Sequence, residues 1–161
     1  MLLLKISIND WTNASHDQRE LFVCKDLGMD VNVLAKGKKS DKGRIDYIDG
    51  FEVHRMTSRP IRWIPISVNR IFSIFIWAKY ARSLHPDIIS GHDLSGLVIG
   101  WIAGVFIRKE RRPKFVYDSH DLEIGRNSKR NWIQIFLIKH LERFMIERSE
   151  FTIVVNDSIA D

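Results

Sequence analysis

The sequence predicts an α/β domain built on a doubly wound, mostly parallel sheet of Rossmann-like topology. Strand-like segments alternate with helix-like segments along the chain, which is typical of parallel strands joined by right-handed crossovers. The segments "DIIS", "KFVYD" and "FTIVV" are near-continuous apolar runs, as expected of strands covered on both faces. A length of 161 residues with 45% hydrophobic residues fits one globular domain with its own core.

The first third of the chain predicts three strands and one helix. The strands are expected at Leu2–Asn9, Asp30–Gly37 and Gly50–Met56, and the helix at Asp17–Leu27. The helix is followed by Gly28, a favoured residue at helix C-termini. The charged segment "KGKKSDKGR" predicts a solvated loop, and Thr57–Val68, which contains two prolines, predicts a second loop.

The remainder predicts three helices, each followed by a strand. The helices are expected at Asn69–His85, Leu94–Lys109 and Asn131–Ser149, and the strands at Asp87–Asp93, Lys114–Asp121 and Phe151–Val155. The second helix is apolar nearly all round, as expected of a helix packed tightly on a sheet. The third is expected to be the longest.

Composition limits the classes of function. The net charge of +5 favours an anionic partner, such as phosphate, a nucleotide, nucleic acid or an acidic membrane surface, and charge alone does not choose among them. No recognised motif combines basic and aromatic residues as nucleic-acid binding requires, so that partner is disfavoured. The single cysteine, Cys24, excludes an internal disulfide and is expected to be a small buried residue. The longest apolar stretch, Leu94–Ile107, is shorter than the roughly 20 residues that cross a bilayer, so a cytoplasmic protein is expected.

Two similar stretches, "IISGHDLSG" and "FVYDSHDLE", each run from a predicted strand into a His-Asp-Leu turn. Ligands of parallel sheets bind beyond the carboxyl ends of the strands, so both His-Asp pairs are expected at one edge. Asp93 also suits a helix cap, and that alternative stays open. His120 and Asp121 have no comparable local task, because the next long helix starts well beyond them. His120 is therefore the strongest candidate for contact with a substrate.

The loop after the first strand, "INDWTNASHD", contains neither the G-x-G-x-x-G fingerprint nor a P-loop. This argues against a dinucleotide or ATP site in this part of the chain. Asp17 either caps the first helix or binds a ligand. Arg19 either grips an anionic oxygen or is solvated, and the sequence leaves both alternatives open.

A metal-assisted phosphoesterase is an alternative, with His92, Asp93, His120 and Asp121 as candidate ligands. The D-x-H motif and the asparagine–histidine pair of such enzymes are missing, so no metal site is predicted.

A second alternative is a non-catalytic domain that recruits an enzyme to anionic membranes. The segment from Arg59 to Lys79 mixes arginines with tryptophans and large aliphatic residues, which suits an acidic membrane or an acceptor. Arg62 and Trp63 are the candidate contacts. The opposing interpretation is that the apolar side chains of the helix pack on the sheet while the arginines are solvated. Those side chains are Ile71, Phe72, Ile74, Phe75 and Ile76.

The segments "SGHDL", "VYDSHDLE" and "ERSEFTIVVNDSIAD" together resemble the N-terminal domain of retaining GT-B glycosyltransferases of family 4. The resemblance is to members of the bacterial polysaccharide and lipopolysaccharide type, and it covers essentially the whole chain. "DQRE" at Asp17–Glu20 is similar to a "D-x-R-V" pattern of that family.

The resemblance implies two Rossmann-like domains, of which the N-terminal one receives a glycan or lipid-linked acceptor and the C-terminal one binds a nucleotide-sugar. It implies that His120 and Asp121 are catalytic, lie near the transferred sugar and need no metal. The reaction would retain the anomeric configuration of the transferred sugar. The cytoplasmic protein would work at the inner face of the membrane. The acceptor side would comprise Asp17, Arg19, His92 and Asp93. Arg62 and Trp63 are added to it as the candidate contacts of the segment from Arg59 to Lys79.

Residues 1–161 are expected to form this single N-terminal domain, with the nucleotide-sugar domain absent from the chain. No cofactor is expected within the domain, and the domain alone is expected to transfer no sugar. A natural product of about twice this length is expected on the usual domain scale.

Overall fold

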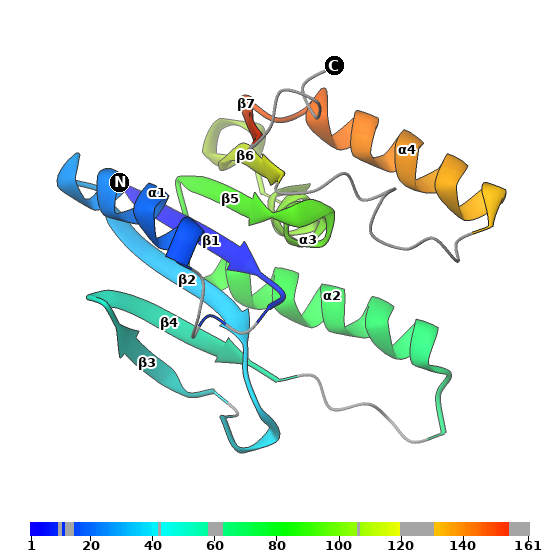
Figure 1. Ribbon diagram of the computed structural model, residues 1–161, viewed down its shortest axis with the longest axis horizontal. Helices are drawn as coiled ribbons and strands as arrows, with labels where there is room; N and C mark the ends of the chain where they lie inside the picture. The colour runs from blue at the N-terminus through cyan, green and yellow to red at the C-terminus, as the bar shows by residue number, and fades with distance from the viewer. Residues whose placement is uncertain are drawn as a thin grey trace.

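The computed structural model describes residues 1–9, 11, 15–41, 43–57, 63–105, 107–119 and 131–154. They form one seven-stranded sheet with the spatial order β3-β4-β2-β1-β5-β6-β7 (Figure 1). The strands are β1 (Leu2–Ser7), β2 (Asp30–Lys36), β3 (Ile45–Ile48), β4 (Phe51–Met56), β5 (Ile88–His92), β6 (Lys114–Ser119) and β7 (Phe151–Val154). The helices are α1 (Ser15–Asp26), α2 (Ile66–Ser83), α3 (Asp93–Val105) and α4 (Trp132–Ile146).

The predicted doubly wound, mostly parallel sheet is confirmed. Every pairing between described strands is parallel except that of β3 with β4. β1 lies in the middle and pairs with β2 on one side and β5 on the other. The carboxyl ends of the parallel strands therefore meet at one edge of the sheet, the carboxyl edge.

The sequence analysis missed β3, a seventh and antiparallel strand. β3 and β4 are joined by Asp49 and Gly50, whose φ angles of 51° and 81° are both positive. A two-residue Asp-Gly turn of this kind matches the twist of a tight hairpin. The turn was visible in the sequence, but the strand before it has only four residues and is half exposed.

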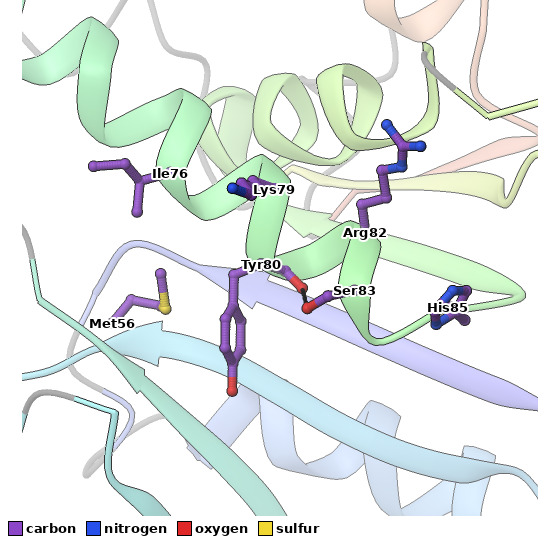
Figure 2. Close-up of a pocket in the computed structure, with 7 residues that line it drawn as sticks. All are labelled: Met56, Ile76, Lys79, Tyr80, Arg82, Ser83 and His85. Carbon is purple, nitrogen blue, oxygen red and sulfur yellow. Dashed lines mark hydrogen bonds between the residues drawn. The ribbon is translucent and has the colours of Figure 1, made fainter.

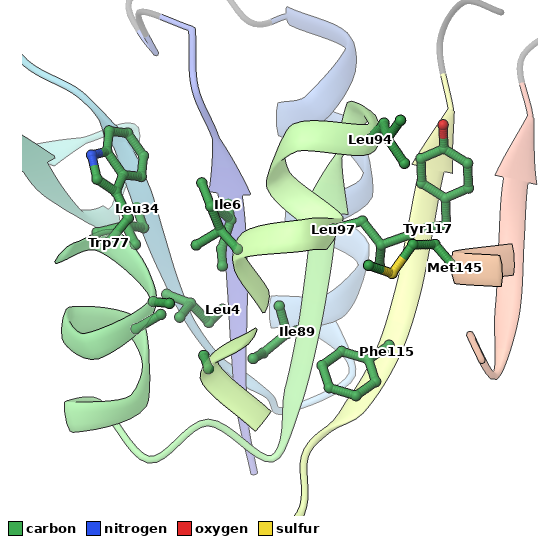
Figure 3. Packing of buried hydrophobic residues seen from close by; sticks show 14 residues of the cluster. Leu4, Ile6, Leu34, Trp77, Ile89, Leu94, Leu97, Phe115, Tyr117 and Met145 are labelled. Atoms are coloured by element: carbon green, nitrogen blue, oxygen red, sulfur yellow. The ribbon is translucent and has the colours of Figure 1, made fainter. Parts of the chain in front are cut away.

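Two apolar clusters cover the two faces of the sheet. One packs the sheet against α2, α3 and α4, through residues such as Ile6, Ile89 and Met145 (Figure 3). The other packs the opposite face against α1 and includes Leu21 and Val33. The alternation of side chains along each strand divides the core in this way.

Several predicted details were wrong. α2 has 18 residues and is longer than α4, which has 15. α3 begins at Asp93 and ends at Val105, earlier than predicted. Cys24 is only half-buried.

The packing expected of the apolar residues of α2 was also wrong for most of them. The helix turns Trp77, Ala78 and Ala81 toward the sheet, and Ile74 packs partly against them. Each of the other four apolar side chains is more than half exposed. They are Ile71, Phe72, Phe75 and Ile76.

The start of α3 lies directly against β1. A Cβ atom on Gly96 would stand 2.5 Å from the backbone oxygen of Ile6, closer than a carbon atom can approach. Gly96 therefore lets α3 pack directly on the central strand β1, and this contact sets the distance between the helix and the sheet.

We expect Gly96→Ala to lower the free energy of unfolding by roughly 1–3 kcal/mol, the usual cost of overpacking. Gly104→Ala in the same helix is the matched control, because its new methyl group would meet the ring of Phe115, a side chain that can move. Urea denaturation of both variants measures the difference. A Gly96 variant as stable as the wild type would show that the close approach to Ile6 does not constrain the helix.

Candidate functional site

A pocket of about 700 Å³ lies at the carboxyl edge of the sheet. Its walls come from the ends of β1, β2 and β4 and from the flanks of α2 and α3. The residues that line it are Ile8, Lys36, Gly37, Thr57, Arg70, Ser73, Ile74, Trp77, Ser95 and Ile99. Five segments that are distant in the sequence thus converge where ligands of parallel sheets bind.

The pocket combines three kinds of group. Lys36 and Arg70 supply positive charge, and the described residues that line it include no carboxylate. Hydroxyl groups come from Thr57, Ser73 and Ser95, while residues such as Trp77 supply an apolar wall. Such a lining suits a ligand that carries hydroxyl groups, an anionic group and an apolar part.

A buried group of charges lies on the face of the sheet that packs against α1, between β1, β6 and α1. The side chain of Lys5 in β1 is 0% exposed. Its Nζ donates to Oε2 of Glu20 in α1 at 2.7 Å and to Oδ2 of Asp118 in β6. Ser90 in β5 donates to the other oxygen of Glu20 at 3.4 Å. One ammonium thus joins three elements.

The two carboxylates keep Lys5 charged. Burial lowers the pKa of the Lys5 ammonium, but the charges of Glu20 and Asp118 and their hydrogen bonds raise it by more. The pKa therefore lies above its ordinary value of 10.5. A lysine buried without such partners would instead lose its proton readily.

His92 connects these charges to the carboxyl edge. Its Nδ1 lies 3.6 Å from Oδ2 of Asp118, and its Nε2 lies 3.5 Å from Oδ2 of Asp93. His92 and Asp118 are also direct neighbours in the register of β5 and β6. The ends of the two similar strands therefore meet side by side.

Asp93 lies at the junction of β5 and α3. It is the first residue of the helix, it is buried, and its φ angle of 60° is left-handed. A carboxylate at this end is stabilised by the helix dipole, and the capping role considered for it stays a prediction. Its contact with His92 shows that it also belongs to the group at the edge.

Of the predicted site residues whose side chains the structure describes, Arg19, Trp63, His92 and Asp93, none is among those that line the pocket. Arg19 lies exposed on α1, and Trp63 is 84% exposed shortly before α2. Asp17 lies in α1, but its side chain is outside the described part of the structure. His120, Asp121 and Arg62 lie outside the described residues altogether.

Sequence reasoning missed Lys5, Glu20 and Asp118 as one group, and it missed Lys36 and Arg70 in the pocket. The only available signal was Lys5, a charge inside the apolar run "LLLKISI" of a central strand. A lysine there must either reach solvent or find a carboxylate.

A second groove, of about 500 Å³, runs between α2 and β4. Figure 2 shows Met56 of β4 facing Ile76 and Tyr80 of α2, with Lys79, Arg82 and His85 farther along the groove. The hydroxyl of Tyr80 lies 2.9 Å from Nδ1 of His54, which ties the helix to the strand beneath it. The groove lies on the α2 face of the sheet, away from the group around Lys5.

Within the part of the chain that the structure describes, no three or more His, Cys, Asp or Glu side chains are grouped so that they could hold a metal ion. The described helices include none that is long and apolar enough to pass through a bilayer.

A family model described as Glycosyltransferase Family 4 matches residues 24–161. Among solved structures, the chain is similar to sucrose-phosphate synthase from Thermosynechococcus elongatus, with a TM-score of 0.73 and 12% sequence identity. The match covers 99% of this chain and 43% of that protein, so the chain spans less than half of its neighbour. At this identity the likeness shows a shared fold. No curated protein matches the sequence.

We expect Lys5→Met to lower the free energy of unfolding by about 3–5 kcal/mol, as when one partner of a buried ion pair is removed. The physical reason is that the buried carboxylate of Asp118 then lacks this cation. Urea denaturation at neutral pH measures the loss. The double variant Lys5→Met/Asp118→Leu should recover much of it, because no buried carboxylate is left at position 118.

Arg143→Met is the matched control for the ion pair. Arg143 and Glu147 form an exposed pair of 3.0 Å within α4, and such pairs contribute only about 0.3–0.5 kcal/mol. Equal losses for the Lys5 and Arg143 variants would contradict a structural role for the buried charges.

Proposed function

This chain belongs to glycosyltransferase family 4, and on that premise we propose that it is the acceptor-binding half of a glycosyltransferase. The enzyme transfers a sugar from a nucleotide-sugar to a glycan or a lipid-linked acceptor, in the synthesis of cell-surface polysaccharide or lipopolysaccharide. Anomeric configuration is retained in the product.

The observation that carries this proposal is the pocket at the carboxyl edge. Its three hydroxyl side chains can exchange hydrogen bonds with the hydroxyl groups of a sugar, and Arg70 and Lys36 can bind a phosphate. Arg70 is suited to hold two phosphate oxygens at once, because its guanidinium is a planar fork. Ile8 and Ile74 supply apolar surface against which a sugar ring can pack.

In this proposal the charges around Lys5 position the residues of the edge. Lys5 fixes Asp118, and Asp118 lies beside His92 at the end of the neighbouring strand. We assign catalysis to His120 and Asp121, which follow Ser119, the last residue of β6, in the sequence. We assign supporting acceptor contacts to the other predicted residues. They are Asp17, Arg19, Arg62, Trp63, His92 and Asp93.

We further propose that the nucleotide-sugar site is supplied by polypeptide outside these residues, so that the domain alone transfers no sugar. In support, the chain spans only 43% of the structurally similar sucrose-phosphate synthase.

We expect Arg70→Met, in the enzyme that contains this domain, to raise the KM for acceptor about 10- to 100-fold, because a charge-assisted hydrogen bond is lost. The KM for the nucleotide-sugar should stay unchanged. Incorporation of labelled sugar into the extracted lipids and glycans of the source cells gives both constants, when it is measured against extract concentration and, separately, against nucleotide-sugar concentration.

Arg108→Met is the matched control, since Arg108 lies exposed after α3, at the edge opposite the pocket. An unchanged acceptor KM in the Arg70 variant, or an increase confined to the nucleotide-sugar, would contradict the assignment of this pocket to the acceptor.

A further inference from the structure

Two helices carry exposed apolar side chains at their N-terminal ends. In Figure 1 these ends of α2 and α4 extend past the tips of the arrows of β1 and β5, so both lie at the carboxyl edge. The exposed residues at the two ends are Val68, Ile71, Phe72 and Phe75 in α2, and Trp132, Ile133, Phe136 and Leu137 in α4. Both helices flank α3 on the same face of the sheet.

The outward face of α2 changes from apolar to basic along its length. Val68, Phe72 and Phe75 follow each other at helical spacing, and Lys79 continues the same row. Arg82 lies beside this row in the last turn. The helix contains no acidic residue. A surface helix that is apolar on its outward face as well as its inward face normally has a partner.

The outward face of α4 begins in the same way. Trp132 and Phe136 form a row that the exposed Lys139 and Arg143 continue, with Arg143 paired to Glu147 at 3.0 Å. The inward face is held to the domain by Met145 and by Glu142, which accepts a hydrogen bond of 2.7 Å from the hydroxyl of Tyr117 in β6. Burial and this bond hold the pKa of Tyr117 above its ordinary value.

The basic residues that follow the apolar ends of the two helices favour an anionic membrane as their partner. Apolar residues followed by basic ones suit insertion into a bilayer, with the basic residues at the level of acidic headgroups. Trp63, which precedes α2 and is 84% exposed, is of the residue type that favours the membrane interface.

We propose that the N-terminal ends of α2 and α4 jointly dock the domain on an anionic lipid bilayer, with the acceptor pocket at the bilayer surface. The pocket is lined by the flank of α2, through Arg70, Ser73 and Ile74, on the same helix whose outward face meets the lipid. This placement rests on the proposed function, and it favours a lipid-linked acceptor over a free glycan. The phosphate and first sugars of a lipid-linked acceptor lie at the bilayer surface, which is where the pocket would be.

The test is flotation of the purified chain with vesicles of phosphatidylcholine, with and without phosphatidylglycerol. We expect binding to the acidic vesicles that falls as salt is added. Phe72→Glu/Phe75→Glu and Trp132→Glu/Phe136→Glu should each weaken binding at least tenfold, because a charge replaces each apolar contact. Lys79→Gln should weaken it about fivefold on acidic vesicles only.

The matched control is Val23→Glu/Leu27→Glu, which changes two exposed apolar residues at the far end of α1. Its binding should equal that of the wild type, and circular dichroism checks that every variant is folded.

Three results would overturn the proposal. The wild type could fail to float with acidic vesicles, the control could lose as much binding as the other variants, or the double variants could abolish self-association and leave flotation unchanged. The last result would assign the face to a second copy of the chain. Flotation involves no sugar transfer, so the proposed acceptor role can fail while vesicle binding persists, and the reverse.

Discussion

The structure depends on one ammonium group, that of Lys5 at the centre of the sheet. A charge in the middle of a central strand is costly unless carboxylates surround it, and Glu20 and Asp118 come from two other elements to do so. Helix α1, strand β1 and strand β6 must therefore meet in one arrangement. Because Asp118 lies beside His92, the same requirement fixes the ends of β5 and β6 at the carboxyl edge.

The two faces of the sheet divide the work of the domain. One face holds the buried charges beneath α1, and the other holds the apolar core beneath α2, α3 and α4. The pocket opens where these two layers end, with cations from β2 and α2 and hydroxyl groups from α2, α3 and the end of β4. In the proposed function this edge holds the acceptor while a sugar is brought to it.

The sequence predicted the α/β class, the mostly parallel sheet and the resemblance to family 4, and all three are confirmed. The alternation of strand-like and helix-like apolar segments predicts the fold class, because each segment is recognised from residues that are neighbours in the sequence. The sequence did not predict the orientation of α2, because apolar residues occur on more than one side of this helix and do not show which side faces the sheet. It could not predict the pocket either, because Lys36, Arg70 and Ser95 come together only once the crossovers are in place. The roles of His120 and Asp121 remain predictions.

The direct test of the central claim is the charge of Lys5, which the resonance of its Nζ reports in a pH titration followed by nitrogen NMR. The account predicts that the ammonium stays protonated beyond pH 10.5, because both carboxylates hold its pKa above that ordinary value. Loss of the proton near neutral pH, as in a lysine buried without partners, would contradict it.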